Sequence, residues 1–527
     1  MLVGDHYEGG SFEMQLDTFL HHLHFSVDEI MPHNQEVNWE DAPLPYKLYR
    51  GLPSIPLSLE VPLTVRNQQM YNSPTITNIG HFLWYTFGLT KVCQPSVEHN
   101  VNIFRRFLPS GGGLYPNELY IYLKIEDCPQ GIYHYDVAHH RLLLLRAGNF
   151  DSYLEKSLGD RCDISDCFGT IFVSTMFWKN FFKYNHFSYR LHSLDTGVLI
   201  GQLLASSKQF GYTTGVYYQF LDRAINHLLG LSEEEESVYA IIPLSNESTW
   251  RNPLTIPNVT SNDLLEQLPI LQHKHFVRSK HVTEYPMILK INEASMLETT
   301  EQFRTLRNEA ITTYGKDSFS LPKVEQLSYD FRVVCQKRYS PESDFFLTKL
   351  NVTELATLLQ ETASSFFYQN DIDNSDKNPK ARVSLYGCFS HIDGLPSGAY
   401  SYNSDAHALE SIAPGDHRHL LHSSLTIDNV NLYQVPLCLH VIGNTDYMKD
   451  TFGYRGYRIQ QMEAGILVQK LLLAATAMGM GGHPLLGFDV NLCDQLYKID
   501  VTQKTTLIQI PVGFSRPRNW LKGNLHS

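Results

Sequence analysis

"YRLHSLDTGVLIGQLLASSKQFGY", residues 189–212, returns later in the chain as "YRIQQMEAGILVQKLLLAATAMGM", residues 457–480. The two segments align without a gap at an offset of 268 residues. In each of them, apolar residues recur at the three- and four-residue spacing of an amphipathic helix. Each segment also reaches a glycine near its end, Gly211 or Gly479, which is typical of a helix C-terminus. The pair therefore predicts two equivalent long helices.

Two further pairs of segments match at nearly the same offset. "GIYHYD" (131–136) corresponds to "GAYSYN" (398–403), and "AIIPLS" (240–245) corresponds to "IQIPVG" (508–513). Alternating and apolar runs of this length predict β-strands. Because strand, long helix and final strand occur twice in the same order, we expect a tandem of two similar α+β domains. Each would pack helices on a mainly antiparallel sheet.

The repeats also divide the chain. We expect an N-terminal arm over residues 1–60, a first repeat over 61–245, a connecting segment over 246–325 and a second repeat over 326–527. Prolines in the arm favour an extended course, and the connecting segment is long enough to hold some helix. Two related halves in one chain often reproduce a homodimer, which has two equal sites at its interface. A fused pseudo-dimer is free to lose one of them.

The composition of the chain argues against several classes of function and location. Hydrophobic residues make up 43% of the chain and charged residues 18%, and the net charge of −13 argues against a broad nucleic-acid-binding face. The eight cysteines include no CxxC pair, so we expect reduced thiols, no metal site and a cytoplasmic location. The N-terminus lacks the basic start and apolar core of a signal peptide. Gln469 and Lys470 interrupt the most apolar stretch, residues 464–482, which we interpret as a buried helix rather than a membrane span.

One motif points to a family. "LPSGGGLYPNELYIY", residues 108–122, resembles the Pro-Ser loop of the FMN-dependent nitroreductase superfamily, and most closely its SagB-type azoline dehydrogenases. The segments "PYKLY" (45–49) and "SPTITNIGHFLWYTFGLT" (73–90) are similar to that group as well. The resemblance implies that both repeats have the nitroreductase fold and that FMN is the cofactor.

The resemblance also implies how FMN is held between the two halves. In that family one half supplies the Pro-Ser loop, and the other supplies an Arg-x-Ser, a Pro-x-x-Gly-Phe-Asp turn and terminal basic residues. The residues that match are Pro109, Ser110, Gly111, Gly112, Arg338, Ser340, Pro484, Leu486, Gly487, Arg516 and Arg518. We expect the flat flavin to lie against the glycine loop, where a Cβ would collide with it.

The two repeats have lost complementary parts of this site. The first keeps Arg66 but has Gln68 in place of the serine, and the second has no counterpart of the glycine loop. These losses predict one complete flavin site in each chain. The family's second basic residue, two positions after the serine, is Glu342 here. Phosphate binding would then depend on the arginines, whose planar guanidinium groups suit phosphate.

A second signature of these dehydrogenases is a Lys-Tyr pair, found here as Lys183 and Tyr184 in "FFKYNHF". The repeat offset places Thr451 and Phe452 opposite them, so the pair exists only in the half with the glycine loop. Aromatising an azoline removes a proton from Cα and a hydride from Cβ. The resemblance implies that Lys183 takes the proton, that Tyr184 orients the ring or relays the proton, and that FMN takes the hydride and is reoxidised by O2.

The residue pairs Tyr189-Arg190 and Tyr457-Arg458 occur in both halves, so we interpret them as structural. The function implied is oxidation of thiazoline or oxazoline rings in ribosomally synthesised peptides, beside a cyclodehydratase that makes the rings. The sequence leaves open another peptide-directed flavin oxidoreductase, such as a dehydroalanine reductase or a nonribosomal thiazoline oxidase. It also leaves open a flavin-free scaffold in a peptide-modifying complex. It does not decide whether the fused chains form a homodimer.

Overall fold

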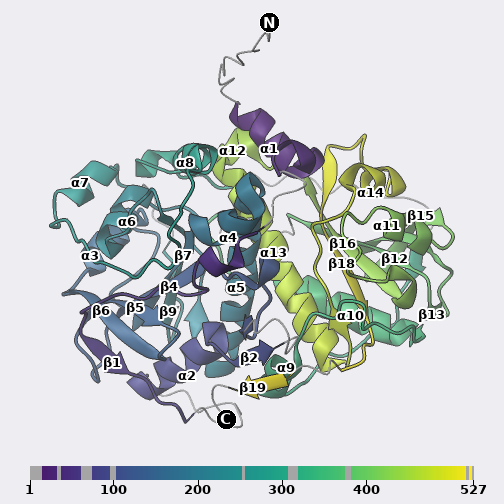
Figure 1. The fold of residues 1–527 in the computed structure, drawn as a ribbon, viewed down its shortest axis with the longest axis horizontal. Helices are drawn as coiled ribbons and strands as arrows, with labels where there is room; N and C mark the ends of the chain where they lie inside the picture. Colours follow the sequence, from purple (N-terminus) through teal and green to yellow (C-terminus); the bar gives the residue numbers. More distant parts are fainter. Residues whose placement is uncertain are drawn as a thin grey trace, which may run out of the picture.

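Two α+β halves lie on either side of a central pair of long helices, α5 (Ser188–Phe210) and α13 (Arg455–Ala477) (Figure 1). The computed structural model describes residues 15–31, 37–60, 74–94, 103–251, 256–306, 318–373, 382–517 and 521–524. The two helices are the segments that the repeat predicted. Gly211 ends α5 with a left-handed φ of 72°, and Gly479 takes a φ of 80° just beyond α13.

Each half contains a seven-stranded sheet with the same strand order. The first runs β1-β6-β5-β4-β7-β9-β8 and the second β10-β15-β14-β12-β16-β18-β17, and the neighbouring strands of both sheets are antiparallel. The strands of the first sheet are β1 (Ser54–Pro56), β4 (Asn117–Leu123), β5 (Gly131–Asp136), β6 (Arg141–Ala147), β7 (Gly169–Met176), β8 (Thr213–Thr214) and β9 (Glu236–Ser245). Those of the second are β10 (Ser318–Ser320), β12 (Ser384–Phe389), β14 (Gly398–Asn403), β15 (Ala408–Pro414), β16 (Leu437–Asn444), β17 (Gly481–Gly482) and β18 (Lys504–Gly513). The predicted tandem α+β fold and its repeated strands are confirmed.

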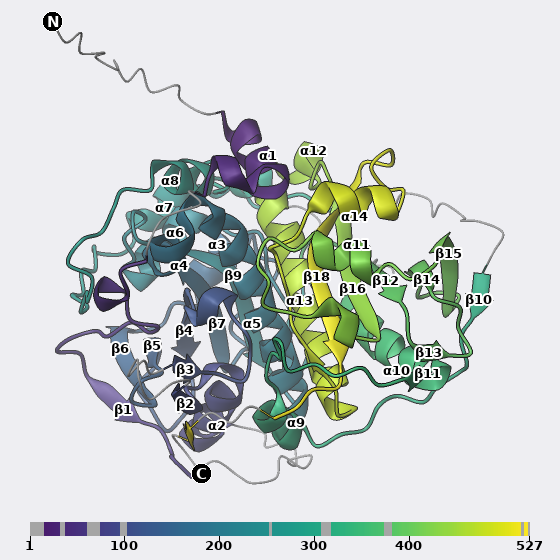
Figure 2. The same cartoon turned by 45° about the vertical axis from the view of Figure 1, so that its right-hand side comes forward.

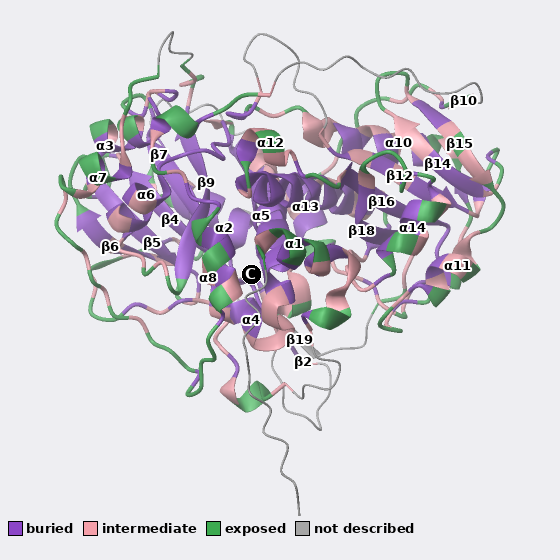
Figure 3. Ribbon diagram, turned by 90° about the horizontal axis from the view of Figure 1, so that it is seen from above, coloured by how far each residue is buried: buried purple, intermediate pink, exposed green. Residues whose placement is uncertain are grey.

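The two central helices touch backbone to backbone. Gly197 and Gly465 occupy equivalent positions of the repeat, and a Cβ on either would collide with the other helix, at the carbonyl of Met462 or of Leu194. Figure 3 shows both helices buried between the two sheets. In the first turn of each helix, the equivalent rings of Tyr189 and Tyr457 stack on each other, with centroids 5.9 Å apart. Their burial supports a structural role.

The remaining helices cover the sheets or join the halves. They are α1 (Leu16–Phe25), α2 (Ile76–Phe87), α3 (Asp151–Ser157), α4 (Phe177–Tyr184), α6 (Asp222–Leu229), α7 (Ser261–Leu265), α8 (Pro286–Glu293), α9 (Phe331–Lys337), α10 (Val352–Ala363), α11 (Arg418–Ser423), α12 (Lys449–Phe452) and α14 (Val490–Leu496). The helix expected in the connecting segment is present as α7 and α8. Within the described ranges, no helix combines the length and the apolar character needed to cross a bilayer. All eight cysteines are buried, and none of them forms a disulfide.

Several strands cross the boundaries that the repeats predicted. β1 comes from the segment predicted as an arm and β10 from the connecting segment, so each sheet begins earlier in the chain than expected. At the other end, β19 (Leu521–Asn524) leaves the second half and pairs with β2 (Lys91–Gln94), which in turn pairs with β3 (Ile103–Arg105). Figures 1 and 2 show β19, in yellow, beside β2. The C-terminal strand β19 therefore belongs to a three-stranded sheet with two strands of the first half.

Candidate functional site

The Pro-Ser-Gly loop connects β3 to β4 and is tied to the central helix α5. The hydroxyl of Ser110 donates a hydrogen bond of 2.6 Å to the carboxylate of Asp195, and the backbone N–H of Gly111 donates one of 3.2 Å to the same group. In turn, Ser110 Oγ accepts the N–H of Tyr115 at 2.9 Å. The serine thus closes the loop on itself and anchors it to α5.

The glycines of the loop are required by the chain itself. Gly112 and Gly113 have φ values of 62° and 70°, a region that favours glycine. A Cβ on Gly112 would lie 2.7 Å from the hydroxyl of Tyr184, and one on Gly111 would lie 2.8 Å from the side chain of Leu191. We expected a bound ring to be the reason for these glycines. The backbone conformation already favours glycine at positions 112 and 113, and the contact of a flavin with this loop stays a prediction.

The loop and the Lys-Tyr pair meet at Gly112. Its Cβ position is only 3.2 Å from Nζ of Lys183, and Tyr184 is closer still. Both residues stand in the last turn of α4, which follows β7, the sheet neighbour of β4, so the sheet brings the two motifs together. Burial lowers the pKa of Lys183. Burial raises the pKa of Tyr184, and the nearby charge of Asp195 adds to this effect, so the phenol stays protonated at neutral pH.

Asp195 is a site residue that sequence reasoning missed. It is 4% exposed, and burial raises the pKa of its carboxyl to about 6, while the hydrogen bonds from Ser110 and Gly111 act in the opposite direction. Its signal was present in the opening repeat, where an acid occurs at the same position of both segments, as Asp195 and Glu463. Only the folded chain shows that this acid holds the loop.

Arg338 reaches the loop from the second half. Its side chain is 8% exposed, and Nε donates a hydrogen bond of 2.6 Å to the carbonyl of Phe107, two residues before the loop. Its Nη1 is buried without a hydrogen-bond partner among the described residues. Burial lowers its pKa to about 10, and the charge of Arg105 adds to this. Nη1 of Arg105 lies 3.2 Å from the Cβ position of Gly113, so two guanidinium groups face the loop where an anion could bind.

Other predicted cofactor residues of the second half contact their own half. A Cβ on Gly487 would lie 2.6 Å from the hydroxyl of Thr426. Pro484 and Leu486 are partly buried beside it, and Ser340 is partly buried next to the turn that follows α9. Arg516 is exposed, and its N–H donates to the carbonyl of Asp344 at 2.9 Å. Arg518, like Arg66 and Gln68, lies outside the described residues. The role of this group in binding a cofactor stays a prediction.

The equivalent place in the second half is filled. The repeat offset brings Asp195 onto Glu463, whose carboxylate is paired with the buried guanidinium of Arg382. Val216, the equivalent of Pro484, forms a parallel β-bridge to Asn370. What remains is a cavity of about 10 Å³, lined by Ser365, Phe366, Tyr368, Arg382, Val383, Glu463 and Ile466. That space holds one water at most.

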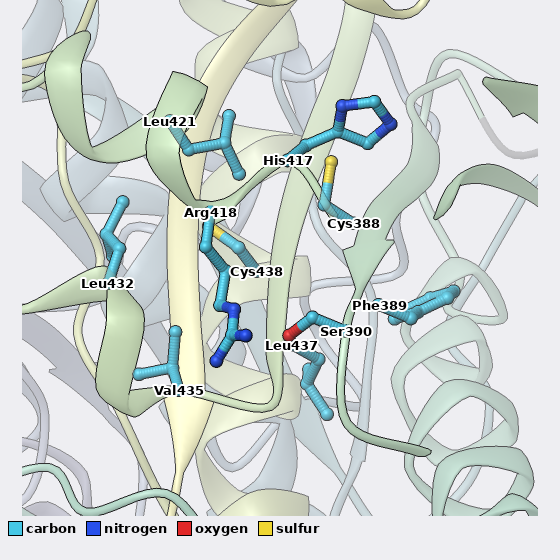
Figure 4. Close-up of a pocket in the computed structure, with 10 residues that line it drawn as sticks. All are labelled: Cys388, Phe389, Ser390, His417, Arg418, Leu421, Leu432, Val435, Leu437 and Cys438. Carbon is cyan, nitrogen blue, oxygen red and sulfur yellow. The ribbon is translucent and has the colours of Figure 1, made fainter. Parts of the chain in front are cut away.

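A second small cavity lies elsewhere in the second half, between β12, β16 and α11 (Figure 4). It too has a volume of about 10 Å³. Cys388 and Cys438, which face each other across neighbouring strands, line one side, and Leu421 and Val435 line another. Its size and apolar walls exclude a cofactor site there.

Part of the chain is similar in sequence to known proteins. Residues 389–514 match the model of the Nitroreductase family. Over 131 residues the chain is 25% identical to MJ1384 of Methanocaldococcus jannaschii, a protein named as a nitroreductase, and this alignment covers 25% of the chain and 64% of the relative. Over 139 residues it is 28% identical to the trifolitoxin-processing protein TfxB of Rhizobium leguminosarum bv. trifolii, covering 25% of the chain and 37% of that protein. The chain thus spans less than two thirds of the length of either relative.

A solved structure covers both halves. A protein of Anabaena variabilis described as a nitroreductase superposes with a TM-score of 0.73 over 95% of this chain and 99% of its own, at 21% sequence identity. At this identity the likeness concerns the fold. The chain therefore has the nitroreductase-like α+β fold in two tandem halves, and residues 389–514 of its second half match the Nitroreductase family model.

Proposed function

We propose that this chain is an FMN-dependent oxidoreductase that converts thiazoline or oxazoline rings of ribosomally synthesised peptides to thiazoles or oxazoles. The observation that carries the proposal is the meeting of Lys183 and Tyr184 with the glycine loop at Gly112, a few ångströms apart. The family domain supports a flavin enzyme. The relative named as a trifolitoxin-processing protein supports a peptide substrate.

The residues present fit FMN. The loop offers a backbone without side chains, and the buried Nη1 of Arg338 has no hydrogen-bond partner among the described residues. Together with Arg105 it would hold the phosphate, since bidentate arginine contacts match phosphate geometry. When bound, FMN supplies the acceptor for the hydride that leaves Cβ of the azoline.

Side chains of this protein would remove the Cα proton of the azoline. Lys183 would take the Cα proton of the azoline as a neutral amine, and its burial lowers its pKa in the direction that this task needs. Tyr184 is protonated at neutral pH and can donate a hydrogen bond to the ring or to the amine. Asp195 keeps the loop in place through Ser110, so it positions the site without touching the substrate.

The partners follow from this chemistry. The substrate is a precursor peptide that already carries azoline rings, so a cyclodehydratase must act on it first. One flavin site per chain is expected, because the equivalent place in the second half is closed by the Arg382–Glu463 pair. Reoxidation by O2 would complete the cycle.

The test is direct. Purified protein should bind about one FMN per chain, and an azoline-bearing peptide incubated with it in air should lose two hydrogen atoms per ring in mass spectrometry. A protein that rejects added FMN contradicts the cofactor. A flavin-loaded protein that leaves azoline peptides unchanged but reduces another peptide group at the expense of NADPH contradicts the substrate assignment.

A further inference from the structure

One aromatic side chain of the N-terminal arm stands beside Lys183. Trp39 begins the short turn η2 (Trp39–Asp41), and 50% of its side chain is exposed. Its ring centroid lies 5.6 Å from Nζ of Lys183. The ring of Phe182 meets it edge-on at 5.9 Å. The indole therefore flanks the last turn of α4 with about half of its surface open to solvent.

The turn that carries this indole is fixed by the connecting segment. Asp41 accepts the backbone N–H groups of Lys280, at 2.6 Å, and His281, at 3.0 Å. On α4 itself, the indole N–H of Trp178 donates to the hydroxyl of Ser279 at 2.9 Å. Two segments outside the repeats thus hold each other against α4. The tryptophan has a defined position next to the amine.

A tryptophan held in this way is suited to contact a ligand. A large, rigid aromatic surface binds other flat groups at a low cost in side-chain entropy. Any ring whose proton is taken by Lys183 must come close to Nζ, and the Trp39 ring centroid lies 5.6 Å from that same atom. An azoline ring, or the peptide unit that carries it, would cover the exposed indole face.

We propose that Trp39 is a substrate-contact residue, whose exposed face packs on the azoline-bearing segment of the peptide beside Lys183. This inference rests on the proposed function and deepens it, because it gives the arm, rather than either repeat, a part in substrate selection. The competing explanation is that Trp39 only fastens the arm to α4 through Phe182. The two explanations differ in whether peptide affinity depends on the azoline ring.

The experiment measures binding rather than turnover. A fluorescently labelled peptide with one thiazoline, and the same peptide with the uncyclised cysteine, are titrated against the FMN-loaded protein by anisotropy. Trp39→Ala should weaken binding of the thiazoline peptide about 10-fold and that of the cysteine peptide less than about 2-fold. Trp39→Phe should stay within about 3-fold of wild type. Phe276→Ala is the matched control, because this exposed aromatic of the same half packs on Arg50.

The outcomes separate the two proposals. Equal affinities of Trp39→Ala and wild type for the thiazoline peptide would overturn the role of Trp39, even if wild type oxidises that peptide. So would an equal loss of both peptides in Trp39→Ala, which is the result of a detached arm. Ring-dependent binding that Trp39→Ala loses and Trp39→Phe keeps supports the role. If wild type shows this binding yet never oxidises the ring, the contact stands and the proposed reaction fails.

Discussion

Replacing Asp195 with asparagine should change how the stability of the chain depends on pH. Burial raises the pKa of this carboxyl to about 6 from its ordinary value of 3.8. Between these two values, the folded chain keeps a proton that the unfolded chain has lost, so the free energy of unfolding falls as the pH rises. A pKa difference of one between the folded and the unfolded chain changes the free energy of unfolding by about 1.4 kcal/mol. The rise from 3.8 to about 6 therefore corresponds to about 3 kcal/mol. This stability is fully present below about pH 4 and is lost as the pH rises from there through about pH 6.

Asparagine keeps an oxygen for Ser110 and Gly111 but cannot titrate. The unfolding free energy of Asp195→Asn minus that of wild type should therefore increase by about 3 kcal/mol between about pH 3 and about pH 7. Urea unfolding of both proteins over this range measures the difference, in which groups common to both cancel. Glu463→Gln is the matched control at the equivalent position, and it should be less stable at every pH, because it removes one of the two carboxylates that pair with the buried Arg382 and leaves only Asp373.

A constant difference between wild type and Asp195→Asn over the whole range would refute the reasoning. It would mean that the carboxylate is ionised in the folded chain as readily as in the unfolded one. The hydrogen bonds of 2.6 Å and 3.2 Å that it accepts would then outweigh its burial.

Three further changes test the site. Lys183→Met should retain FMN and lower the rate of azoline oxidation about 100-fold or more, as followed by mass spectrometry, and Lys349→Met, an exposed lysine of the second half, should not change it. Arg338→Gln should weaken FMN binding about 10- to 100-fold in a fluorescence titration of the apoprotein, and the exposed Arg516 should matter less when changed in the same way. If both substitutions weakened FMN binding equally, the phosphate would not depend mainly on the buried Arg338. Gly112→Ala should cost about 1–3 kcal/mol of stability, because its φ of 62° and the Tyr184 hydroxyl both resist a Cβ, and an unchanged melting temperature would contradict this.

The candidate site was only partly visible in the sequence. The glycine loop and the Lys-Tyr pair could be found by their resemblance to a family, and the structure brings them together at Gly112. Asp195 could not be assigned, because an acid in a helix repeat is usually a surface residue, and only packing shows this one buried beneath the loop. The positive φ values of Gly112 and Gly113 favour glycine independently of any ligand, and the contact of a flavin with the loop stays a prediction.

Local patterns determined the tandem organisation of this protein. Helical spacing, strand alternation and their recurrence at one offset depend on neighbours along the chain, and so the sequence alone predicts α5, α13 and the repeated strands. The tertiary structure decided which distant groups meet: Arg338 with the loop of the other half, Trp39 with Lys183, and Arg382 with Glu463 in the closed counterpart. Such contacts depend on which side chains are buried together when the two halves pack. No periodicity along the chain encodes that choice.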